Sequence, residues 1–194
     1  MKDTNIRIPL YAALALAIAL AACQPGKATE LREQALVAAP GKPNLIGTAY
    51  AQYLVSMIVR AERIVISEHS DAYDGVTGKG PAKPIVDYTE HTLTKNQSDL
   101  LLGAVLEMDP SAHGAPPVGQ FKSRHTMRFY VDGKLLSTME LCFDCGQIRW
   151  QGGLDAPYPD AMVATLKKAI RNFGLTTDRD WDKYALAHEK NLKK

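Results

Sequence analysis

The chain has 194 residues, of which 46% are apolar and 23% charged, and its formal net charge is +2. This length suits one ordinary domain after removal of a short leader. A charge so close to zero gives no support for nucleic-acid binding, which depends on clustered Lys and Arg side chains. The sequence therefore predicts no nucleic-acid partner.

The amino terminus carries an export signal. Lys2 and Arg7 precede an apolar run of 13 residues, Leu10 to Ala22. That run is too short to cross a bilayer, which takes about 20 helical residues. Its length and basic start are typical of a signal-peptide core. Residues 1–22 are therefore predicted to be a signal peptide.

The apolar run ends in Leu20-Ala21-Ala22-Cys23. This motif resembles the lipobox of bacterial lipoprotein precursors, and the resemblance covers the export segment alone. It implies cleavage before Cys23 and a lipid on the Cys23 sulfur, which would attach the protein to a membrane. In Gram-negative lipoproteins an Asp after the Cys favours retention in the inner membrane. Gln24 stands there instead, which implies the periplasmic side of the outer membrane. The alternative is a soluble secreted protein in which Cys23 is incidental.

The mature chain is predicted to be a lipidated tether, residues 23–43, followed by a single domain, residues 44–194. The tether is rich in Pro, Gly, Ala and charge. The first half of the domain alternates helices and strands with two long loops. The predicted elements are a helix over 45–60 capped by Asn44, a strand over 62–68, a loop over 70–84, a strand over 85–92, a helix over 95–107 opened by a Thr94–Gln97 capping box, and a loop over 109–119.

A hairpin is predicted around Asp132-Gly133, between strands over 121–131 and 135–143. A three-residue loop pairs Phe129 with Leu135 and His125 with Met139, and it sets Arg124 opposite Glu140 and Lys122 opposite Cys142. It gathers one apolar face, made of Phe121, Met127, Phe129, Leu135, Met139, Leu141 and Phe143. A two-residue loop would scatter that face, so the three-residue register is predicted.

A second turn is predicted at Asp144–Gly146, with Gly146 left-handed and Phe143 paired with Gln147. A strand over 148–150 follows, then a helix over 160–173 ended by Gly174 and a last helix that starts within 177–180. The predicted order is α-β-β-α-β-β-β-α-α. It indicates an α+β domain with an antiparallel sheet of about five strands and helices packed on its apolar face.

Two cysteines remain once Cys23 is assigned to the lipid. Cys142 and Cys145 are an even pair in an oxidising compartment, which favours a disulfide between them. A thiol-redox role is the first alternative, but such pairs usually open a helix, and here Cys142 ends a strand. Zinc is the second alternative, with His91 or His125 as further ligands, although no second spaced Cys pair exists. The Cys-Phe-Asp-Cys segment also resembles a strand end in small uncharacterised bacterial proteins, which implies no activity.

No catalytic residue and no cofactor are predicted, because the chain carries no Gly-x-Ser-x-Gly or His-Glu-x-x-His motif. The resulting hypothesis is a lipid-anchored, periplasm-facing binding protein with a periplasmic protein partner. Its sharper form is an inhibitor or immunity protein that protects the envelope from a toxin or hydrolase. The rival hypothesis is a metal-binding or thiol-redox protein that uses Cys142 and Cys145.

Overall fold

The computed structural model describes residues 47–72, 74, 82–112, 120–151 and 156–192. The signal peptide, Cys23, the tether, Asn44 and most of the two long loops lie outside these residues, so their predictions stay predictions. The described elements are α3 (Thr48–Arg60), β1 (Arg63–His69), β2 (Asp87–Thr92), α4 (Lys95–Leu106), β3 (His125–Val131), β4 (Lys134–Cys142), β5 (Gln147–Gln151), α5 (Met162–Asn172) and α6 (Trp181–Leu192).

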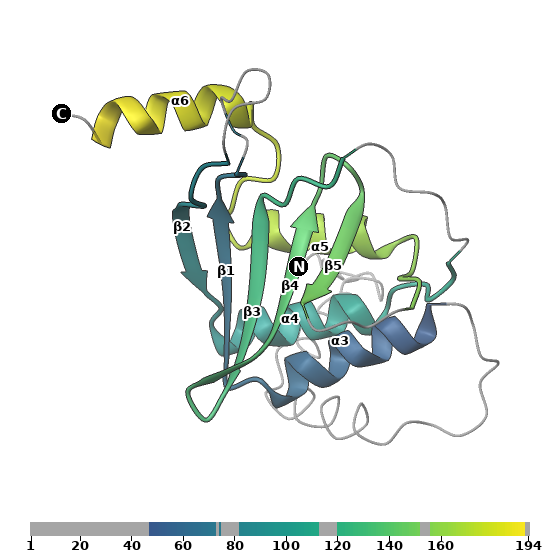
Figure 1. Cartoon of the computed structure of the whole chain (residues 1–194). Coiled ribbons are helices and arrows are strands. Elements are labelled where there is room, and N and C mark those ends of the chain that lie inside the picture. The colour runs from purple at the N-terminus through teal and green to yellow at the C-terminus, as the bar shows by residue number, and fades with distance from the viewer. Residues whose placement is uncertain (1–46, 73, 75–81, 113–119, 152–155, 193–194) are drawn as a thin grey trace, which may run out of the picture. The chain divides into compact units, whose positions relative to one another are not determined.

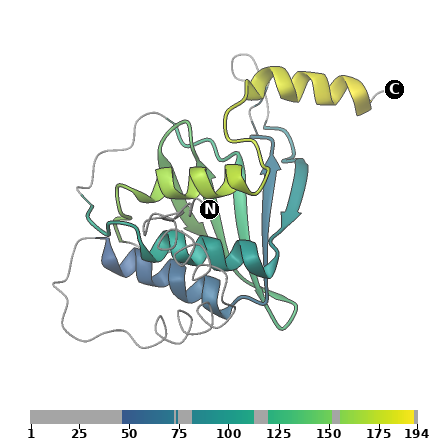
Figure 2. The same cartoon turned by 180° about the vertical axis from the view of Figure 1, so that it is seen from behind.

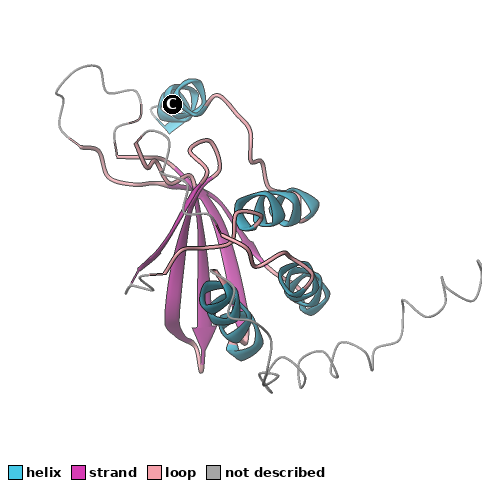
Figure 3. Cartoon of the chain, turned by 90° about the vertical axis from the view of Figure 1, so that its right-hand side faces the viewer, coloured by secondary structure: helices cyan, strands magenta, loops and turns pink. Residues whose placement is uncertain are grey.

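The five strands form one antiparallel sheet in the order β2-β1-β3-β4-β5. Helices α3, α4 and α5 cover one face of this sheet, and α6 lies beyond one of its ends (Figures 1–3). The covered face is apolar, with side chains that are at most 2% exposed: Ile64, Ile66, Met127, Phe129, Met139 and Leu141. This architecture confirms the predicted α+β class, the element order and the helices on the apolar face.

Local signals place two helix ends as predicted. At the start of α4, the Gln97 amide donates to the Thr94 hydroxyl and the Thr94 amide donates to the Gln97 side chain, which confirms the capping box. After α5, Gly174 adopts a left-handed φ of 90° and ends the helix. The start of α3 differs from the prediction. Its N-cap is Gly47, with φ 94°, because a side chain there would meet Pro110 and Pro159.

The predicted register of the β3–β4 hairpin is wrong. The loop has two residues, Asp132 and Gly133, both with positive φ, so that Val131 pairs with Lys134. A β-bulge then leaves Leu136 without a partner, and Phe129 pairs with Ser137 rather than with Leu135. The bulge restores the alternation of the strand, so Met127, Phe129, Met139 and Leu141 still share the buried face. Leu135 does not, because it lies on the turn side of the bulge.

Two predicted side-chain pairings fail with that register. Glu140 lies opposite Thr126 rather than Arg124. β3 begins at His125, so Lys122 does not pair with Cys142. At the second turn Gly146 is left-handed as predicted, but Cys142 rather than Phe143 pairs with Gln147. The turn is therefore one residue longer on the β4 side, which brings Phe143 into the loop.

None of the helices that the structure describes is long and apolar enough to cross a membrane.

Candidate functional site

Polar side chains gather where β1 ends and β3 begins, and we call this region the polar end of the sheet. Glu68 and His69 close β1, and Arg124 and His125 open or immediately precede β3. All four are at most 6% exposed. Charged groups are rarely buried so fully unless they are paired, so each needs a partner.

Glu68 holds the segment that leads into α6. Its Oε1 atom accepts a 2.5 Å hydrogen bond from the Thr176 amide, and its Oε2 atom lies 3.0 Å from the Arg179 guanidinium. Arg179 in turn lies over the ring of Tyr184 in α6, at 4.2 Å. One buried carboxylate therefore joins the sheet to the chain before α6 and, through Arg179, to the helix itself.

Arg124 is paired with Asp74. The two form a direct ion pair, and their side chains are only 7% and 3% exposed. The guanidinium of Arg124 also lies 5.5 Å from the ring centre of Trp181, the first residue of α6. Asp74 accepts a second hydrogen bond, of 2.8 Å, from the Asp71 amide. The pair thus fixes the loop after β1 against the start of β3.

The two histidines have separate roles. His69 places Nδ1 2.9 Å from the Ser70 carbonyl and Nε2 2.8 Å from the Thr126 hydroxyl. His125 donates from Nε2 to the Thr176 carbonyl at 2.8 Å, and burial lowers its pKa to about 4. At neutral pH His125 is therefore uncharged.

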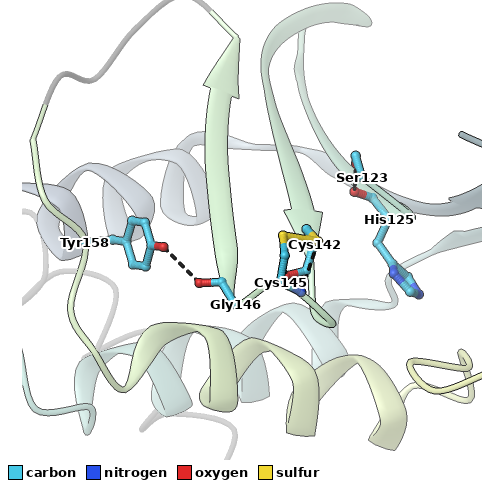
Figure 4. Close-up of a disulfide and its surroundings, with 6 residues drawn as sticks. All are labelled: Ser123, His125, Cys142, Cys145, Gly146 and Tyr158. Atoms are coloured by element: carbon cyan, nitrogen blue, oxygen red, sulfur yellow. Dashed lines mark hydrogen bonds between the residues drawn. A yellow bond between two sulfur atoms is a disulfide. The ribbon is translucent and has the colours of Figure 1, made fainter. Parts of the chain in front are cut away.

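Ser123 lies close to both histidines but is not arranged as a nucleophile. Its hydroxyl donates to the His125 carbonyl at 3.0 Å (Figure 4), while His69 Nε2 is 3.4 Å away. A serine nucleophile needs its proton directed at a base. The polar end therefore supplies structural hydrogen bonds rather than a charge-relay arrangement.

The two cysteines lie at this same end, with Cys142 as the last residue of β4 and Cys145 in the β4–β5 turn. The Cys142 and Cys145 sulfurs are joined as a disulfide, and their Cα atoms are 5.4 Å apart (Figure 4). Cys142 is 2% exposed, and the Cys145 amide lies 3.2 Å from its sulfur. The ring of Phe143, between them, packs 5.0 Å from that of His125. The disulfide turn and the polar end therefore adjoin.

The histidines considered for zinc are engaged elsewhere. His91 lies in β2, where Nε2 is 3.2 Å from the Gln97 side chain, and His125 contacts Thr176 as described above. Among the described residues, no group of three or more His, Cys, Asp or Glu side chains is placed to hold a metal ion. The structure thus brings the two cysteines together without adding a third ligand from this part of the chain.

A groove of about 480 Å³ runs between α4 and α5. Leu100 lines it and is 59% exposed, and a Cβ added at Gly103 would meet no atom within 4 Å. Sequence reasoning missed this groove. A usable signal was present in Leu100-Leu101-Leu102, because three consecutive helical side chains span about 200° of the helix surface and cannot all face one core. Leu101 and Leu102 are buried, and Leu100 is the one left outside.

The described residues thus define a protein class, an α+β domain with one helix-covered sheet, a disulfide turn and a groove between α4 and α5. Comparisons of the chain with protein-family models, with curated proteins and with solved structures found no match.

Proposed function

We propose that the protein is an outer-membrane lipoprotein, anchored through Cys23, whose domain faces the periplasm and acts by binding another protein. The observation that carries the anchor is the Leu20-Ala21-Ala22-Cys23 motif directly after the apolar run. The several acyl chains typical of bacterial lipoproteins would hold the domain firmly, whereas one chain would bind reversibly.

The α4–α5 groove supports the binding role. Exposed apolar surface that is concave and rimmed by polar groups is typical of protein contacts. The groove is lined by apolar residues, among them Leu100, Ala104 and Phe173, and by polar ones, among them Glu107 next to α4 and Lys168 in α5. An amphipathic helix of a partner would suit such a surface. The sharper proposal is that the partner is an envelope-acting hydrolase or toxin, which the domain inhibits.

The anchor is tested on the full-length protein expressed in a Gram-negative host. Cells are labelled with an alkyne fatty acid, and the intact mass of the mature protein is measured by mass spectrometry. Its location is determined by separating the inner and outer membranes. We expect labelling and outer-membrane recovery, both lost in Cys23→Ser and both kept in Cys145→Ser. Unlabelled mature protein in the soluble periplasmic fraction would refute the anchor.

The binding role is tested with a matched pair in α4. Leu100→Asp places a charge in the groove, whereas Leu106→Asp alters another exposed leucine of α4 that does not line it. Partners cross-linked to the anchored protein are identified, and any enzyme among them is assayed with and without the purified protein. We expect Leu100→Asp alone to lose one specific partner and its inhibition. Equal recovery from both variants would reject the groove as the binding surface.

A further inference from the structure

The β3–β4 turn leaves two consecutive leucines in solvent at the end of the sheet opposite α6 (Figure 1). Leu135 is 54% exposed and Leu136 is 38% exposed. Alternation along a strand would place one of two neighbours inside. Both stay outside because Leu135 lies between the turn and the bulge, and the bulge leaves Leu136 unpaired.

The surroundings of these leucines suit a lipid surface. Lys134 precedes them and is exposed, and Arg63 lies across the strand pair with its guanidinium 3.8 Å from the ring centre of Tyr130. Basic groups around apolar side chains, with a Tyr beside them, are typical of segments that enter the headgroup region of a membrane. Asp132 and Glu62 lie nearby, so net charge adds little and the leucines supply the main contact.

From these contacts we infer that the turn, with Leu135 and Leu136, is a second membrane contact that dips into the bilayer surface. This inference rests on the proposed lipid anchor. The 23 residues between Cys23 and Gly47 can span up to about 80 Å when extended, which is long enough for the turn to reach the bilayer that holds the lipid. A lipid anchor also raises the local concentration of the membrane for the turn, so a weak apolar contact suffices.

The contact is tested with Leu135→Trp in the mature lipidated protein. The protein is reconstituted into vesicles of phosphatidylethanolamine and phosphatidylglycerol whose acyl chains carry bromine, which quenches nearby tryptophan. Leu186→Trp is the matched control, because Leu186 is 48% exposed in α6, at the other end of the sheet (Figure 2). The emission of Trp150 and Trp181 is subtracted by comparison with the unaltered protein.

We expect the bromine to quench the added emission of Leu135→Trp and to leave that of Leu186→Trp unchanged. Equal quenching of both, or of neither while the protein still floats with the vesicles, overturns the turn contact and leaves the anchor intact. A blue shift of Leu135→Trp without vesicles overturns it in favour of a second copy of the chain. Protein that neither floats nor carries lipid overturns the anchor and, with it, this contact.

Discussion

The two ends of strand β3 differ in how they are held. At the polar end, Glu68, Arg124 and His125 are buried and contact segments that lie about 50 to 108 residues away along the chain. At the other end the chain turns through Asp132 and Gly133, which contact solvent and follow a purely local geometry. One end depends on long-range pairing, and the other depends on backbone conformation.

This difference predicts where substitutions act. A buried ion left without its partner costs several kcal/mol, whereas a strained turn residue costs about 1 kcal/mol. The polar end should therefore respond to charge and pH, and the turn should respond only to backbone preference.

The largest expected effect is at Arg124. Arg124→Met leaves Asp74 buried without its ion pair and should lower the free energy of unfolding by about 3–5 kcal/mol. Arg128→Met is the control, since Arg128 is partly exposed, pairs with the more exposed Asp87 and Glu90, and should lose about 1 kcal/mol. Urea unfolding measures both. Similar losses in the two variants would mean that burial does not separate these ion pairs.

A pH dependence is expected from His125. Its folded pKa of about 4 lies below the unfolded value of about 6.5, so the unfolded chain binds more protons between these values. The contribution of His125 to the free energy of unfolding is therefore complete above about pH 6.5. It falls by about 3 kcal/mol in total as the pH drops to about 4. In His125→Gln, whose amide can still donate to Thr176, this part of the pH dependence should be absent. The test is the difference between the two proteins in unfolding free energy against pH, and parallel curves would contradict it.

The disulfide should contribute less to the free energy of unfolding than Arg124 or His125, because the loop that it closes is short. A loop of four residues gives about 2 kcal/mol in the chain-entropy model. Cys142→Ala/Cys145→Ala should lose about that amount. Adding a reductant should lower the thermal midpoint of the unaltered protein and leave that of the variant unchanged. A midpoint that resists reductant in both proteins would show that the bond is absent or inaccessible.

The smallest effects come from two glycines with opposite expectations. Gly133→Ala should cost about 1 kcal/mol, since its φ of 70° disfavours a side chain. Gly103→Ala should gain about 0.5–1 kcal/mol, because it lies inside α4 with open space at its Cβ. Thermal unfolding of the two variants measures the contrast. Effects of the same sign would show that backbone preference does not decide stability at these positions.

Sequence reasoning succeeded where the signal was local. The Thr94–Gln97 capping box and the Gly174 helix end are each written within a few residues, and both form. It failed for the β3–β4 register, because the loop at Asp132-Gly133 has two residues rather than the predicted three and a bulge follows it. A bulge depends on how two strands pack on a shared core, and one strand's own alternation does not reveal it.

The sequence by itself determined the α+β class, the order of the elements and part of the buried sheet face, namely Met127, Phe129, Met139 and Leu141, because periodicity and turn residues act over short stretches. Only the tertiary structure decided that Glu68, Arg124 and His125 are buried together, that Leu100 borders a groove and that Leu135 faces solvent. Each of these depends on which distant segments come into contact. A charged group is buried where another part of the chain provides its partner, and an apolar group is buried where another part of the chain packs over it.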